Sequence, residues 1–331
     1  MKYEVMIQPE DIQILLNLLD GNINISYPLY KLDIIRTHVD KKGYTLKFPN
    51  KQELWDVFDD FGSLKKEVLN PNDLKSCLLS SGVISFKNLE DIKEEIKTYR
   101  NIKKSVKFSL DTNMLYFNFT LSHGLLDPSE IVLVKTVRDE VIKVMNKKYR
   151  YDEILELNKR GDFDGRILKE LKNKRKKKSR NAKIALKEFT HLRGDAKVIK
   201  ENGSGSPDKR IVDTLAEYEK DFNTTVVLLT ADDACIDLCE AEDVAYIKCD
   251  IPHKIDQTRC SFETFNRLVL NMASMLGIIK VGPVLVYGEY KGYSSNEPDL
   301  LKVKDSYKKR HKQLKKELKI CKELREIGIK K

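Results

Sequence analysis

Four carboxylates occur where short apolar runs stop or where helices are expected to begin. Asp111 directly follows the run VKFSL, and Asp232 follows the run TTVVLLT with one residue between. Glu140 and Asp208 fall in the first turns of two expected helices. Clustered carboxylates repel one another unless a cation neutralises them, and their oxygens suit the hard divalent ions Mg²⁺ and Mn²⁺. The four acids therefore predict a metal site built from four separate segments.

Each acid also has an ordinary structural explanation. Asp111 could begin a turn, and Asp232 could cap the helix that follows it. Glu140 could extend into solvent, and Asp208 could interact favourably with the dipole of its helix. The joint occurrence carries the prediction, because all four ordinary explanations would have to hold independently.

Helical phase relates two of these acids to buried faces. Thr136 is the expected N-cap of one helix, whose inward stripe is Val137, Val141 and Val144, and Glu140 borders that stripe. In the second helix Ser206 is the expected N-cap, with Pro207 at the first position. Asp208 shares a face with the apolar residues Ile211, Val212 and Leu215. Asp213 is rotated roughly 140° from Asp208 around the same helix and remains an alternative ligand.

The segments that must position these acids alternate in character. From residue 106 onward, short β-rich runs alternate with helical stretches; the runs are VKFSL, EIVLVK, TTVVLLT, VAYIKC and GPVLVYG. Such alternation predicts a parallel sheet covered by helices. The carboxyl ends of parallel strands meet at one edge of a sheet, where sites form. The acids are therefore expected to converge there.

Four segments together resemble a known family. FSLDTNML, VKTVRDEV, SPDKRIVDTLA and VVLLTADDACIDLCEAEDVAYI, spread in this order over about 106–252, look like the motifs of the PIN domain family of metal-dependent ribonucleases. The resemblance could extend to residue 290. It implies a three-layer α/β/α domain with a central, mostly parallel sheet. That α/β domain would be preceded by a smaller α/β domain and followed by a basic C-terminal helix.

The resemblance also implies a site and a reaction. Asp111, Glu140, Asp208 and Asp232 match the family's four acids and would bind Mg²⁺ or Mn²⁺ as catalytic residues. The supporting residues would be Asn113, Thr230, Asp213 and Asp233. Metal-activated water would then hydrolyse RNA phosphodiester bonds in RNA processing or decay. Two alternatives stay open: a DNA- or structure-specific nuclease of the wider superfamily, and a non-catalytic RNA-binding scaffold.

Composition divides the chain further. Residues 1–100 are expected to form an α/β domain of unknown role, and 106–290 the PIN-like domain, interrupted by a basic insertion at about 165–203. Residues 300–331 are expected to form a basic amphipathic helix. Its apolar stripe comprises Val303, Tyr307, His311, Leu314, Leu318, Cys321 and Leu324. A homo-oligomer is compatible with this organisation.

Charge predicts the partner. The 331 residues carry a formal net charge of +10, which favours nucleic acid: RNA first, with DNA as the alternative. The expected phosphate contacts are Lys174, Arg175, Lys176, Lys177, Lys178 and Arg180. No apolar run approaches the roughly 20 residues that span a bilayer, and no signal-peptide segment opens the sequence, which predicts a cytoplasmic protein without membrane contact. The six cysteines lack paired metal-ligand spacing, so we expect no zinc ribbon.

Overall fold

The chain folds into two compact units. A computed structural model describes residues 3–19, 21–29, 32–160, 166–171, 175–255, 258–290 and 300–329. One unit comprises Met1–Lys75, Lys147–Arg180 and Asp256–Lys331, and is called here the antiparallel unit. The other comprises Ser76–Asn146 and Asn181–Ile255, and is called the parallel unit. Each unit is therefore built from segments that are distant in sequence.

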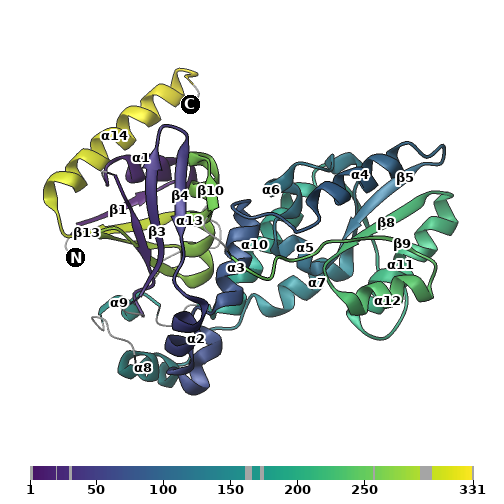
Figure 1. Ribbon diagram of the computed structural model, residues 1–331, viewed down its shortest axis with the longest axis horizontal. Helices are drawn as coiled ribbons and strands as arrows, with labels where there is room; N and C mark the ends of the chain where they lie inside the picture. The colour runs from purple at the N-terminus through teal and green to yellow at the C-terminus, as the bar shows by residue number, and fades with distance from the viewer. Residues whose placement is uncertain are drawn as a thin grey trace. The chain divides into compact units, whose positions relative to one another are not determined.

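The antiparallel unit contains an eight-stranded sheet in which all neighbours are antiparallel (Figure 1). In spatial order its strands are β1 (Tyr3–Ile7), β13 (Leu301–Asp305), β12 (Val284–Tyr287), β11 (Ile278–Val281), β2 (Asn24–Ser26), β3 (Asp33–Asp40), β4 (Gly43–Lys47) and β10 (Thr258–Cys260). A Lys-Lys-Gly turn joins β3 to β4. Gly43 has φ +137°, and a Cβ there would lie 2.1 Å from the carbonyl oxygen of Cys260. Only glycine fits this turn without displacing β10.

The antiparallel unit also contains helices. They are η1 (Pro9–Asp11), α1 (Ile12–Asn17), α2 (Lys51–Asp59), η2 (Gly62–Glu67), α8 (Tyr151–Arg160), α9 (Arg166–Lys169), α13 (Phe262–Leu276) and α14 (Lys308–Glu326). Buried residues of α13 include Phe265, Leu268, Met272 and Leu276, which recur three and four apart and form one apolar face. Two further helices, α3 (Pro71–Ser81) and α10 (Lys177–Leu192), include residues of both units.

The parallel unit contains the sheet that positions the acids. Strands β5 (Val106–Leu110), β8 (Thr225–Thr230) and β9 (Ala245–Lys248) form a parallel sheet in the order β5-β8-β9 (Figure 1). A parallel pair of β6 (Val132–Val134) and β7 (Lys197–Ile199) joins it through a bridge between Phe108 and Ile131. The expected mixed α/β fold with a parallel sheet is thus confirmed.

The helices of the parallel unit are α4 (Leu89–Arg100), α5 (Thr112–Tyr116), α6 (Phe119–His123), α7 (Lys135–Val144), α11 (Pro207–Phe222) and α12 (Asp233–Ala241), with η3 at Pro128–Glu130. One core joins them to the strands; the fully buried residues include Phe108, Leu110, Val137, Val212 and Leu228. The strands β5 and β8 are buried at consecutive positions, as expected for strands covered on both faces. None of the described helices is long and apolar enough to cross a membrane.

The compact units do not follow the boundaries expected from the sequence. The run GPVLVYG forms β12, which pairs antiparallel with β11 and β13 instead of joining the parallel sheet. The segment expected as an insertion is divided between the units, because Ala182, Ala185 and Phe189 of α10 belong to the core of the parallel unit. The apolar periodicity at 182–192 fits this burial, although the basic composition suggested a solvated segment.

Two local expectations were wrong. Val303 is not part of the C-terminal helix, because it pairs with Val5 and Val286 in the sheet, where β13 lies between β1 and β12. Thr136 is not an N-cap: α7 begins at Lys135, and the Thr136 hydroxyl donates to Glu201 at 2.7 Å. Ser206 and Pro207 are confirmed as the N-cap and first residue of α11.

Candidate functional site

The ends of two paired strands hold the first two acids. Strands β5 and β8 run parallel, with Leu110 opposite Leu229, and the backbone amide of Asp111 donates to the Leu229 carbonyl at 3.2 Å. Asp111 is the N-cap of α5, and Asp232 is the N-cap of α12. Because the strands end side by side, both carboxylates lie at the carboxyl edge of the sheet.

Asp111 is held rigidly in a nearly dry environment. Its side chain is 3% exposed, and one carboxylate oxygen accepts from the Met114 amide at 2.7 Å. The other oxygen accepts from the buried hydroxyl of Thr230, which in turn accepts from the amide of Asp232 at 3.0 Å. Thr230, expected as a supporting residue, thus links the two capping acids directly.

Carboxylates from three elements lie close enough for their charges to act on Asp111 and Asp208. Burial raises the pKa of Asp111 to about 6, against the lowering effect of the bonds from Thr230 and Met114, and the charges of Asp232 and Asp208 raise it further. The pKa of Asp208, in the first turn of α11, is raised by burial and by the charge of Asp232. Three of the predicted acids are therefore neighbours whose negative charges oppose one another.

Glu140 is attached to the same edge through a residue that the sequence interpretation missed. Its carboxylate accepts from the Thr112 hydroxyl at 2.5 Å, and Thr112 directly follows Asp111. Burial, and secondarily the charge of Glu140, raises the pKa of Tyr116 to about 12. A threonine next to Asp111 was the available signal, but its bond to Glu140 joins positions 28 residues apart.

Two of the supporting residues have other roles. Asp213 pairs with Lys209 at 2.9 Å, one turn earlier in α11, and is not among the charges that act on Asp111. Asp233 is exposed and pairs with Lys248 at 2.6 Å. Asn113 lies in α5 with its side chain exposed to solvent. The structure therefore brings Asp208 near Asp111 and Asp232, and these three residues are called here the acidic cluster. Asp213 stays in a helical ion pair.

The donor set fits a hard cation, although it is not preassembled. Within the described ranges, no three His, Cys, Asp or Glu side chains form a cluster that could hold a metal ion. The same described residues supply no lysine or arginine that pairs with Asp111, Glu140, Asp208 or Asp232. Carboxylate oxygens that repel one another and lack a cation partner match the ligand preference of Mg²⁺ and Mn²⁺.

Four cations of the basic run predicted to contact nucleic acid have partners within the fold, so the expectation needs correction for these four. Lys177 is 7% exposed and pairs with Asp73 at 2.6 Å, and Lys176 pairs with Glu153. Arg180 is 1% exposed and donates to the Met275 carbonyl at 2.9 Å, while Arg175 lies 3.7 Å from Glu289. Of the predicted cations, Lys178 is exposed and Lys174 lies outside the described residues. The acidic partners of Arg175, Lys176 and Lys177 are distant in sequence and neutralise these three cations inside the antiparallel unit.

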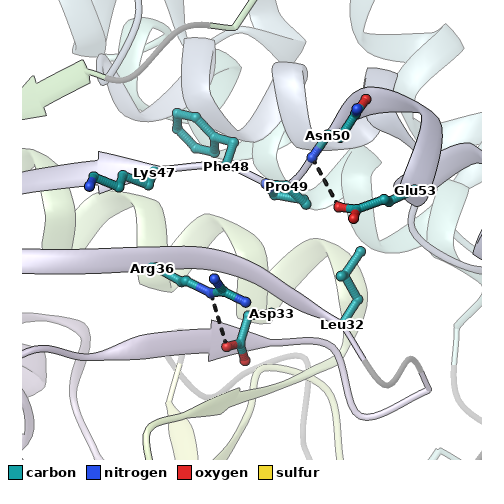
Figure 2. Close-up of a pocket in the computed structure, with 8 residues that line it drawn as sticks. All are labelled: Leu32, Asp33, Arg36, Lys47, Phe48, Pro49, Asn50 and Glu53. Atoms are coloured by element: carbon teal, nitrogen blue, oxygen red, sulfur yellow. Dashed lines mark hydrogen bonds and ion pairs between the residues drawn. The ribbon is translucent and has the colours of Figure 1, made fainter.

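The antiparallel unit also contains a pocket of about 330 Å³. Figure 2 shows its lining residues: Leu32, Asp33, Arg36, Lys47, Phe48, Pro49, Asn50 and Glu53. Arg36 lies 3.4 Å from Asp33, and Glu53 accepts from the Asn50 amide as part of the capping box of α2. Asp33 therefore has a cationic partner, and Glu53 takes part in a helix cap.

These observations define a class: an α/β domain that presents a group of carboxylates at the carboxyl edge of a parallel sheet. Residues 108–245 match the family model of the PIN domain, which confirms the resemblance seen in the motifs. PIN domains are generally nucleases and typically depend on Mg²⁺ or Mn²⁺. No curated protein matches the chain.

Proposed function

We propose that the protein is an endonuclease that hydrolyses RNA phosphodiester bonds with the help of a divalent metal ion. One observation carries the proposal: Asp111, Asp208 and Asp232 come from three elements, lie close enough for their charges to act on Asp111 and Asp208, and lack a cationic partner among the described residues. This arrangement is unfavourable for the fold alone and favourable for a bound cation. The family match supports the same chemistry.

Asp111, Glu140, Asp208 and Asp232 would hold one or two ions of Mg²⁺ or Mn²⁺. A bound ion supplies positive charge that acidifies water and stabilises negative charge on phosphate oxygens. The chain's own residues provide orientation. Thr230 and the Met114 amide fix the two oxygens of Asp111, and Thr112 orients Glu140. Such bonds to ligand atoms hold the carboxylates in their productive rotamers.

The finer assignment to RNA processing or decay and the three-layer arrangement of the domain belong to the same proposal. Helices α11, α12 and α4 pack against the strands of the parallel sheet, which supports the layered fold. Basic overall charge supports a polyanionic substrate.

Cleavage by the full chain tests the proposal. Labelled single-stranded RNA, hairpin RNA, single-stranded DNA and flap DNA are incubated with Mn²⁺, Mg²⁺ or EDTA, using wild type and the folded variant Asp111→Asn. We expect metal-dependent cleavage of RNA that the variant lacks. Exclusive cleavage of DNA would reassign the substrate. RNA binding without cleavage of any substrate would favour the non-catalytic scaffold instead.

A further inference from the structure

The C-terminal helix α14 begins with an arrangement of charge that opposes helix formation. Its first turn contains Lys308, Lys309 and Arg310 and no acid. The N-terminus of a helix carries a partial positive charge, so cations there destabilise it. The local sequence is thus unfavourable for the helix itself, and such violations are expected where a ligand compensates.

Several cations of α14 are neutralised by the chain. Arg310 pairs with Asp305 at 2.6 Å, and Arg325 pairs with Asp11 at 2.8 Å. Near the end of the helix, Lys319 and Lys322 each have a glutamate one turn later. These pairs neutralise cations at the two ends of the helix. They do not include the lysines of its first three turns.

Five lysines of those turns are different. They are Lys308, Lys309, Lys312, Lys315 and Lys316; all are exposed, and the described part of the chain provides none of them with an ion pair. Positions three and four apart are neighbours on a helix, so these like charges repel by about 0.2–0.5 kcal/mol for each pair. This set is called the lysine face.

Packing keeps the lysine face directed toward solvent. His311 and Leu314 are buried, and α14 contacts β1 and β13 of its own unit. At 100° per residue the five lysines fall on a single arc of the helix. This arc borders the buried side but faces away from the strands. The face extends from Lys308 to Lys316, which is about 12 Å along the helix axis. Along the axis of a double helix the phosphates of one strand recur about every 3.4 Å, so three to four lie along that length.

We propose that the lysine face of α14 is a docking surface for the phosphate backbone of a nucleic acid. The inference rests on the proposed function, because it names a contact surface for the substrate of that nuclease. Each lysine can neutralise one phosphate and release a counterion. Tyr307 at the N-cap is 55% exposed, and the part of its ring that Arg310 does not cover is a platform on which a base can stack.

A nucleic acid fits this surface better than an anionic membrane. Helices that lie on membranes bury an apolar face between headgroups and acyl chains. In the first three turns of α14 the apolar side is already covered, with Leu314 at 2% exposed. What these turns present to solvent is almost entirely ammonium groups, which bind phosphate as point charges.

The test measures binding without cleavage. Fluorescence anisotropy of a labelled RNA 20-mer in EDTA is followed across a salt series, using wild type and a variant with all five lysines of the face changed to Gln. A matched control changes five exposed lysines elsewhere, Lys41, Lys42, Lys66, Lys103 and Lys104, to Gln. We expect the face variant to bind at least about 10-fold more weakly and to lose up to about 3.5 from the slope of log K against log salt.

The control variant should keep its slope within about one unit of wild type. Equal losses in both variants, or an unchanged slope in the face variant, would overturn the inference. Binding of phosphatidylserine vesicles that is lost in the face variant, with RNA binding retained, would also overturn it in favour of a membrane. Wild-type binding through the face without cleavage of any substrate would refute the proposed nuclease and leave this inference standing.

Discussion

The acidic cluster of the parallel unit and the basic run from Arg175 to Arg180 are both dense groups of like charge, but they differ in what surrounds them. Lys177 has Asp73, and Lys176 has Glu153, within 2.6 Å. The acids around Asp111 have one another and two hydroxyl donors. Charge that the fold neutralises stabilises the fold, and charge left without a partner is suited to a ligand.

The largest expected effect separates two acids of the same helix. Asp208→Asn should reduce cleavage by more than about 100-fold, because Asp208 is a proposed metal ligand and not only a residue that orients one. Asp213→Asn, five residues later, removes half of an ion pair with Lys209 and should leave cleavage within about threefold. Initial rates with saturating Mn²⁺ measure both. Equal losses would show that α11 contributes both acids or neither.

The next effect concerns the basic run. Lys177→Gln leaves Asp73 nearly buried without its cation, and should reduce the free energy of unfolding by about 2–4 kcal/mol. The exposed neighbour Lys178→Gln is the control and should change it by less than about 0.5 kcal/mol. Urea denaturation compares them, and RNA affinity should be similar for both folded variants. A stable Lys177→Gln protein that fails to bind RNA would restore the run as a binding surface.

A smaller effect tests how the carboxylate of Asp111 is oriented. Thr230→Val removes the hydroxyl that donates to Asp111 and so raises the pKa of that carboxyl further. Cleavage should fall by about 10–100-fold and recover in part at higher pH, where Asp111 is ionised. Thr230→Ser keeps the hydroxyl and should remain near wild type. A Thr230→Val rate that does not depend on pH would contradict this role.

The smallest effect concerns Glu188, a carboxyl group that has no cationic partner among the described residues and does not belong to the acidic cluster. Glu188 is fully buried and accepts from the Thr120 amide at 2.7 Å; burial raises its pKa to about 8 from an ordinary 4.5. The folded state therefore keeps a proton that the unfolded state loses, and stability falls as pH rises between these values.

Glu188→Gln should match wild type near pH 4 and exceed it by at least about 1 kcal/mol at pH 8. Thermal or urea unfolding across this range measures the difference, and Asp195→Asn on the exposed surface provides a control. A wild type whose stability rises over the same interval would show that Glu188 is ionised in the folded protein.

The sequence predicted most accurately where local patterns determine structure. Asp111 and Asp232 follow apolar runs that form β5 and β8, and Ser206 with Pro207 opens α11 as expected. Pairing between distant residues was not visible. Lys177 and Asp73 are 104 positions apart, and an ion pair of that kind leaves no periodic signal. A basic run therefore has the same appearance whether it is exposed or buried.

The prediction for the C-terminal helix was wrong at Val303 for a related reason. Val303 continues the spacing of three and four residues seen in α14, so periodicity alone included it in the helix. Its partners Val5 and Val286 come from two other strands, and this long-range pairing determines that it is part of β13. Tertiary context outweighs local periodicity at the end of a helix, where a few residues fit either pattern.

Direct metal binding tests the central claim, that the carboxylates without a cationic partner form one cation site. Mn²⁺ is titrated by calorimetry into wild type, Asp111→Asn and Asp213→Asn at pH 7.5 and pH 5. We predict binding to wild type and Asp213→Asn at pH 7.5, weaker binding at pH 5, where Asp111 with its pKa of about 6 is protonated, and none to Asp111→Asn. Equal binding by all three proteins at both pH values would contradict the account.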